Sequence, residues 1–89
     1  MSPKVLVERD LVFWFHSHDA LHEERPSVHV GKGSQDDYND AKIWLEPVIE
    51  VARPGRTLRE HELSRALKVI GQNRDYLLEV WYAYKGRTR

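Results

Sequence analysis

The chain has 89 residues, which is enough for one domain and too few for two. Its 14 basic and 14 acidic residues cancel, and the absence of cysteine excludes disulfides, thiolate metal sites and a cysteine nucleophile. No segment approaches the roughly 20 apolar residues that a transmembrane helix needs, and the N-terminus lacks the apolar core of a signal peptide. We therefore expect a single soluble domain over residues 1–89, located in the cytoplasm and without a membrane partner.

Four short segments have the β-branched, aromatic or alternating composition of strands; they are residues 5–7, 11–16, 27–30 and 41–46. The first two are separated by a short polar turn and pair most simply as a hairpin. Residues 18–26 are polar and end in a proline, and residues 31–40 are rich in Gly, Asp and Asn, so we expect loops at both places.

The hydrophobic period changes after the breaker at residues 53–56. Thr57 is expected to cap a helix there, with Glu60 completing a capping box. Apolar side chains then recur at helical spacing; they are Leu63, Ala66, Leu67, Ile70, Leu77, Leu78, Trp81 and Tyr84. Gly71 weakens the middle of this stretch and Asn73 is able to cap a second helix, so we predict two helices rather than one kinked helix.

The order β-β-β-β-α-α implies an α+β domain. We expect a mainly antiparallel sheet of about four strands with two C-terminal helices packed on one face. The chain then divides into a strand region at 4–47, a linker at 48–57 and a helical region at 58–86.

Side-chain alternation separates the predicted sheet into two faces. One face is purely apolar and consists of Leu11, Phe13, Phe15, Val28, Val30, Ala41, Ile43 and Leu45. The stripe formed by Leu63, Leu67, Ile70, Leu77 and Trp81 is able to cover it. The other face gathers Trp14, His16, His29, Lys42, Trp44 and Glu46. Because two layers leave nothing to cover this face, it is the predicted binding site, unless the loop from Asp19 to Asp40 or the segment after Pro47 folds back over it.

The five histidines invite a metal or acid–base interpretation. His16 and His18 point the same way in an extended strand, but no motif or spaced carboxylate accompanies them, so we predict no metal site and no cofactor. His29 with Glu46 and Lys42 is the catalytic candidate, since a base, an acid and a cation suffice for metal-independent RNA cleavage. Cross-strand pairing of polar residues explains the same set without catalysis, so whether the protein is an enzyme stays open.

Aromatic side chains beside basic ones also fit the binding of single-stranded RNA, whose bases stack on exposed rings. Four basic side chains add positive charge to the helical region; they are Arg59, Arg65, Lys68 and Arg74. The zero net charge and the acidic stretch from Asp19 to Asp40 count against this interpretation, because affinity for nucleic acid comes mainly from neutralised phosphates.

Three segments carry a recognisable pattern: PSVHV at 26–30, AKIWLEPV at 41–48, and the tail at 58–86 with LREHEL, NRDYLLEVW and YKG. Together they resemble the small prokaryotic domain-of-unknown-function family 4160. Phe15, Ser17 and Asp19 also fit the family pattern F-x-S-x-D…P-H-x-H-V. Ser27 stands where the family has the first histidine of its H-x-H pair, so only His29 carries over.

The resemblance implies a small protein of a toxin–antitoxin-like module, often encoded beside another small protein. We expect it to act by protein–protein binding through the open aromatic face, with a neighbouring gene product or a second copy of the chain as partner. The alternatives are a metal-independent ribonuclease toxin and a single-stranded RNA-binding module.

Overall fold

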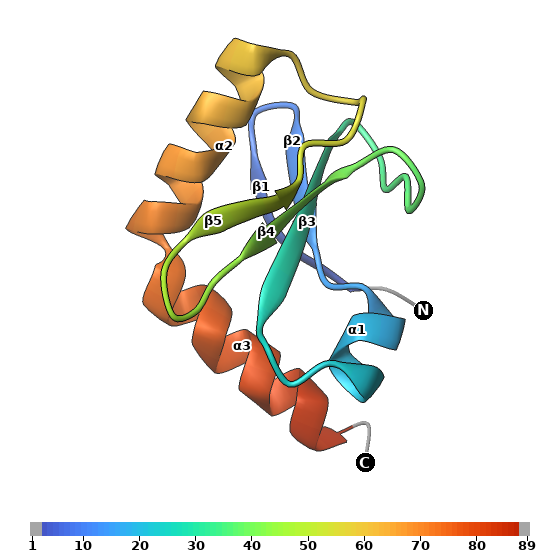
Figure 1. The fold of residues 1–89 in the computed structure, drawn as a ribbon, viewed down its shortest axis with the longest axis vertical. Helices are drawn as coiled ribbons and strands as arrows, with labels where there is room; N and C mark the ends of the chain where they lie inside the picture. The colour runs from blue at the N-terminus through green and yellow to red at the C-terminus, as the bar shows by residue number, and fades with distance from the viewer. Residues whose placement is uncertain (1–2, 88–89) are drawn as a thin grey trace.

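The computed structural model describes residues 3–87 and forms five strands and three helices within that range. In chain order these are β1 (Lys4–Glu8), β2 (Leu11–Trp14), α1 (Ser17–His22), β3 (Ser27–Lys32), β4 (Ala41–Trp44), β5 (Glu50–Arg53), α2 (Glu60–Gln72) and α3 (Arg74–Arg87). The strands form one antiparallel sheet in the order β1-β2-β3-β4-β5. Figure 1 shows α2 and α3 along one side of the sheet, which confirms the predicted α+β class.

The sheet has five strands, and the expected number of four is wrong. The additional strand, β5, lies inside the segment that we predicted to be a linker. All four of its residues are exposed, so its side chains follow no inward–outward hydrophobic alternation. An edge strand of this kind is held mainly by its backbone ladder with β4, which leaves little trace in the residue pattern.

A helix, α1, stands where the sequence predicted a loop. Its start is capped by His16, whose Nδ1 accepts a 3.1 Å hydrogen bond from the backbone N–H of His18. At its end the N–H of Glu23 donates to the carbonyl O of Asp19 at 2.7 Å. Ala20 is buried in the core, whereas Leu21 is half exposed. A six-residue helix with one buried apolar side chain is too short to show a hydrophobic period.

The apolar face of the sheet is confirmed as one wall of the core, because all eight of its predicted residues are buried there. The helices supply the other wall with Ala66, Val69, Ile70, Leu77 and Trp81. Leu63 and Leu67 of the predicted stripe are only partly buried. Trp81 packs edge-on against Phe15, with ring centroids 5.3 Å apart, a favoured aromatic geometry.

The start of α2 lies two residues beyond the predicted cap. Arg59 is the N-cap residue, and its backbone N–H donates to Oε1 of Glu62 at 2.9 Å. A hydrogen bond from Lys32, reinforced by the one from Arg59, lowers the pKa of Glu62 to about 2. The hydroxyl of Thr57 instead donates a hydrogen bond to the carboxylate of Asp40.

Two separate helices are present, as predicted, and Asn73 lies between them. Its Nδ2 donates to the carbonyl O of Val69 at 2.8 Å, and its own carbonyl accepts from the N–H of Leu77 at 2.9 Å. Asn73 therefore ends one helix and starts the next. No helix within residues 3–87 has the length and apolar character to cross a membrane.

Candidate functional site

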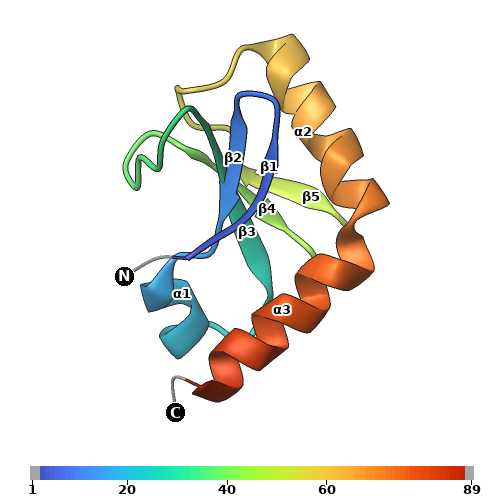
Figure 2. The ribbon, with the colours of Figure 1, turned by 180° about the vertical axis from the view of Figure 1, so that it is seen from behind.

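The second face of the sheet is covered in part, so the expectation of an open aromatic face is wrong for two of its six residues. Trp14 and His29 have exposed fractions of 1% and 3%. As the alternative expected, segments between Asp19 and Asp40 cover these two side chains. The covering segments are α1 and the turn that connects β3 to β4, and both lie on the side away from α2 in Figures 1 and 2.

A buried carboxylate, that of Asp40, fixes the turn onto the sheet. Its Oδ2 accepts from Nε1 of Trp14 and from the backbone N–H of Asp36, both at 2.9 Å. Its Oδ1 accepts from the hydroxyl of Thr57 at 2.8 Å. Asp40 is fully buried, and three donors compensate the loss of its hydration. A Cβ atom on Gly31 would lie 2.2 Å from Oδ2 of Asp40, so the carboxylate occupies space that only glycine leaves.

A second polar cluster lies beneath α1. Nε2 of His29 is 2.8 Å from Oδ2 of Asp19, and the imidazole stacks on Trp14 with ring centroids 4.6 Å apart. Nζ of Lys42 lies 3.4 Å from Oδ2 of Asp19 and 2.8 Å from Oε1 of Glu23. Burial by itself raises the pKa of Asp19, but the hydrogen bond with His29 and the charge of Lys42 outweigh it and hold that pKa below its ordinary value.

The structure brings together only two members of the predicted catalytic set. His29 and Lys42 share Asp19, whereas the carboxylate of Glu46 accepts from the hydroxyl of Tyr82 at 3.2 Å. The carboxylate beside the histidine is therefore Asp19, which the strand pattern did not single out. The side chain of His29 is 4% exposed, and its Nδ1 has no hydrogen-bond partner among residues 3–87. A histidine hydrogen-bonded to a carboxylate is an arrangement found in general bases, but His29 and Asp19 are both enclosed.

Trp44 remains partly exposed at the other end of this face. The guanidinium carbon of Arg25 lies 4.4 Å from its ring centroid and Nζ of Lys42 lies 4.7 Å from it, so the ring contacts two cations. Arg25 is held in place by the carboxylate of Glu50 and the carbonyl O of Glu46. A cavity of about 350 Å³ adjoins this group and is lined by Glu24, Arg25, Pro26, Glu46 and Pro47.

The remaining histidines form no metal site. His16 pairs through Nε2 with the carboxylate of Asp37, and the rings of His18 and His22 lie 4.4 Å apart. Within the part of the chain that the structure describes, no three His, Asp or Glu side chains are placed to hold a metal ion.

The basic side chains of the helical region do not form one continuous free surface. Arg65 pairs with Asp10 at 2.9 Å, and Nε of Arg74 donates to the carbonyl O of Leu45 at 2.9 Å. Arg59 and Lys68 are exposed.

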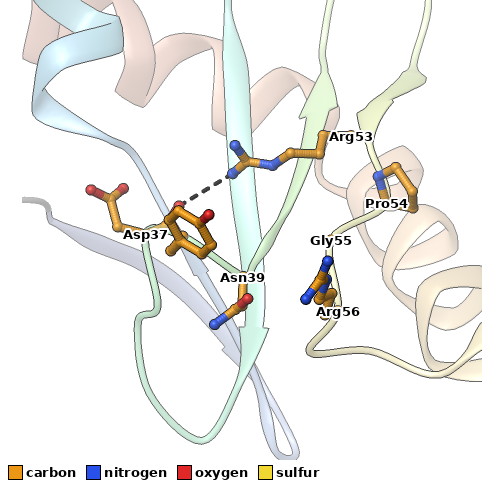
Figure 3. Close-up of a pocket in the computed structure, with 7 residues that line it drawn as sticks. Asp37, Asn39, Arg53, Pro54, Gly55 and Arg56 are labelled. Atoms are coloured by element: carbon orange, nitrogen blue, oxygen red, sulfur yellow. Dashed lines mark hydrogen bonds between the residues drawn. The ribbon is translucent and has the colours of Figure 1, made fainter.

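A cavity that the sequence did not indicate lies between the β3–β4 turn and the turn after β5 (Figure 3). It measures about 520 Å³ and is lined by Asp37, Tyr38, Asn39, Arg53, Pro54, Gly55 and Arg56. Nη2 of Arg53 donates to the carbonyl oxygens of Asp37 and Asp40, at 3.3 and 3.1 Å. In the sequence, Arg53 and Arg56 flank the Pro-Gly pair of the predicted breaker segment, and no other feature of the residue pattern indicates a site there.

A family model described as a domain of unknown function, DUF4160, matches residues 11–82. This range runs from the start of β2 into α3 and contains both polar clusters as well as the two arginines. No curated protein and no solved structure matches the chain. The match confirms the resemblance seen in the sequence, and its description names no activity.

Proposed function

The chain belongs to the DUF4160 family of domains of unknown function, and from that premise we propose that it binds a partner protein as one component of a cytoplasmic toxin–antitoxin-like module. The partner is a small protein encoded by a neighbouring gene. Because Trp14 and His29 are buried, the centre of the second face is not available to a partner. We therefore place the binding surface at the β5 edge of the sheet.

The exposure of β5 is the observation that carries the proposal. All four of its residues are exposed, and the strand ends the sheet because it pairs with β4 alone. An edge strand presents backbone N–H and C=O groups on its outer side, to which an extended segment of another chain can bind. Val48 and Val51, which are 62% and 38% exposed, add apolar surface beside these groups.

The opposite edge of the sheet is less accessible. The hydroxyl of Tyr76 on α3 donates a 2.9 Å hydrogen bond to the carbonyl O of Val5 on β1. The remaining space between β1 and α3 is a cavity of about 360 Å³. An incoming strand would have to compete with α3 at β1, whereas no such bond ties the outer side of β5 within residues 3–87, so β5 is the preferred edge.

The exposed remainder of the predicted face adjoins the start of β5. Trp44 pairs across the ladder with Glu50, and Glu50 holds Arg25 over the indole. The cavity of about 350 Å³ lies next to this group. Strand-addition interfaces combine backbone pairing, which gives affinity, with side-chain pockets, which give specificity. This region of the sheet has both features, since the exposed edge of β5 offers backbone pairing and the nearby cavity offers a side-chain pocket.

Co-expression of the chain with its neighbouring gene product, followed by size-exclusion chromatography, tests the proposal. We expect a complex that Val51→Lys weakens by at least about tenfold, because a charge on an edge strand opposes strand addition. Val7→Lys is the matched control, since Val7 is 52% exposed on β1, and it should leave the complex intact. No complex with the neighbour, or equal loss in both variants, would refute the proposal. Self-association without the neighbour would also refute it.

The burial of His29 weighs against the ribonuclease alternative. A general base must reach the proton that it removes, directly or through one water. The side chains of His29 and Asp19 are 4% and 10% exposed, and α1 lies over them. The cluster of His29, Asp19 and Lys42 is better explained as the polar interior that holds α1 on the sheet.

A further inference from the structure

We propose that the cavity between the β3–β4 turn and the turn after β5 binds a nucleotide unit. Arg53 and Arg56 would hold the phosphate, and the base would stack on the ring of Tyr38. The inference rests on this cavity alone and does not depend on partner binding at β5.

The walls of the cavity are fixed before any ligand arrives. Gly55 adopts φ +67°, and a Cβ atom there would lie 2.3 Å from the carbonyl O of Asn39, so the two turns touch. That carbonyl accepts from the backbone N–H groups of Arg56 at 2.7 Å and Thr57 at 3.3 Å. The buried carboxylate of Asp40 also links the two turns, because it accepts hydrogen bonds from the N–H of Asp36 and from the hydroxyl of Thr57. A rigid wall reduces the ordering cost of binding.

The register of β5 turns Arg53 toward the cavity. Lys42 pairs with Arg53 and Ile43 pairs with Val51, so Ala52 is an extra residue in the ladder. A bulge of this kind shifts the side-chain alternation by one position and re-aims the residues that follow. Arg53 consequently lies on the face of Lys42, beside the β3–β4 turn, where its Nη2 reaches the two carbonyl oxygens.

Neither arginine of the cavity forms an ion pair with a carboxylate within residues 3–87. Nη2 accounts for the hydrogen bonds of Arg53, so its Nε and Nη1 groups have no partner among residues 3–87. The guanidinium of Arg56 likewise has no hydrogen-bond or ion-pair partner within those residues. Guanidinium groups match the geometry of phosphate oxygens and remain charged at any physiological pH. Two of them at one concave site favour an anion.

The turn also carries three carboxylates, those of Asp36, Asp37 and Asp40, and none of them pairs with Arg53 or Arg56 within residues 3–87. Both carboxylate oxygens of Asp36 accept hydrogen bonds within the turn, from Nδ2 and the N–H of Asn39 and from the N–H of Tyr38. Asp37 pairs with His16, and Figure 3 shows its carboxylate directed away from Arg53 and Arg56.

Tyr38 supplies an aromatic surface at the same place. It is 84% exposed, the most exposed of the large apolar and aromatic side chains in the described residues. A ring so exposed contributes little to folding, whereas stacking of a base on such a ring is a recurrent way to hold nucleotides. The cavity volume of about 520 Å³ falls in the range of small-ligand sites.

The nucleotide unit could come from a free mononucleotide or from single-stranded RNA, and the binding assay separates the two. The probes are 5′-AMP, inorganic phosphate, and a fluorescein-labelled RNA of about eight nucleotides, measured by calorimetry or anisotropy. We expect AMP or the RNA to bind more tightly than phosphate, since only they carry a base. Preference for the RNA with a steep salt dependence would identify a strand as the source, and preference for AMP a free nucleotide.

Four variants locate the site. Arg56→Glu and Tyr38→Ala should each weaken binding by about tenfold or more, and Tyr38→Phe, which keeps the ring, should leave it nearly unchanged. Lys68→Glu, an equal charge change on an exposed position of α2, is the matched control and should have little effect. Circular dichroism melting confirms that each variant is folded. The proposal is overturned if neither nucleotide probe binds at about 1 mM, or if Lys68→Glu weakens binding as much as Arg56→Glu.

Discussion

Trp14 and Asp40 lie 26 residues apart in the chain, and the indole Nε1 of Trp14 donates a 2.9 Å hydrogen bond to Oδ2 of Asp40. Both side chains are buried. This bond holds the β3–β4 turn over the second face of the sheet, next to α1, which covers the histidine that the sequence had suggested as a catalytic base. Two carboxylates, those of Asp40 and Asp19, therefore hold the segments that cover this face.

Asp40→Ala should lower the free energy of unfolding by about 3 kcal/mol, because it leaves the donors of Trp14, Asp36 and Thr57 without their acceptor. Urea denaturation followed by circular dichroism measures the loss. Asp37→Ala is the control; its carboxylate is 66% exposed, and its removal should cost less than about 1 kcal/mol. Equal losses in the two variants would contradict the role assigned to Asp40.

Stability should depend on the ionisation of Asp19. Because its pKa is held below the ordinary value in the folded protein, the unfolded chain binds the proton more readily. The stabilising contribution is therefore complete above the ordinary carboxyl pKa, near pH ~4, and is lost as the pH falls toward the lower folded value. Asp19→Asn should reduce this pH dependence. Unfolding free energies of both proteins across this acidic range test it, and a difference independent of pH would contradict the assignment.

Two glycine substitutions should act in opposite directions. A methyl group on Gly31 would meet the buried carboxylate of Asp40 at 2.2 Å, so Gly31→Ala should destabilise the protein by about 2–3 kcal/mol. Gly71 lies in α2, where an added Cβ atom would meet only Cδ1 of Ile49, at 4.0 Å, so Gly71→Ala should stabilise by about 0.5–1 kcal/mol. Thermal melts of both variants are sufficient, and a tolerated Gly31→Ala would mean that the turn can move.

Tyr76→Phe should loosen β1 selectively. The substitution removes the hydroxyl that donates to the carbonyl O of Val5, at a cost below about 1.5 kcal/mol. Hydrogen–deuterium exchange should rise at residues 4–8 and stay constant at residues 50–53. Tyr82→Phe, which removes the hydroxyl bonded to Glu46, is the control and should leave the exchange of β1 unchanged. Equal exchange of β1 in both variants would show that Tyr76 does not protect this edge.

The core could be predicted from the sequence because strand alternation and helix periodicity are local patterns. Phe13 and Phe15 on β2 and just after it, and Ile43 on β4, are buried as that alternation requires. The edge strand β5 was missed because exposed side chains carry no such pattern. The helix α1 was missed because its capping atom, Nδ1 of His16, belongs to a residue type that rarely caps helices.

The candidate site was predictable only in part, because it depends on contacts between distant segments. Alternation placed Trp14, His29 and Lys42 on one face correctly. It could not show that Asp19 and Asp40 would provide carboxylates for that face. The cavity with Arg53 and Arg56 depends on a bulge and on a close approach at Gly55, neither of which the residue types specify.

Each of the three tryptophans lies in a different environment. Trp14 stacks on an imidazole beneath α1, Trp44 contacts two cations near the surface, and Trp81 meets the ring of Phe15 in the core. Each indole therefore has its own set of quenching groups. Single-tryptophan versions of the chain would let intrinsic fluorescence report, without an added dye, whether the covering loop, the surface end of the sheet or the helical layer opens first.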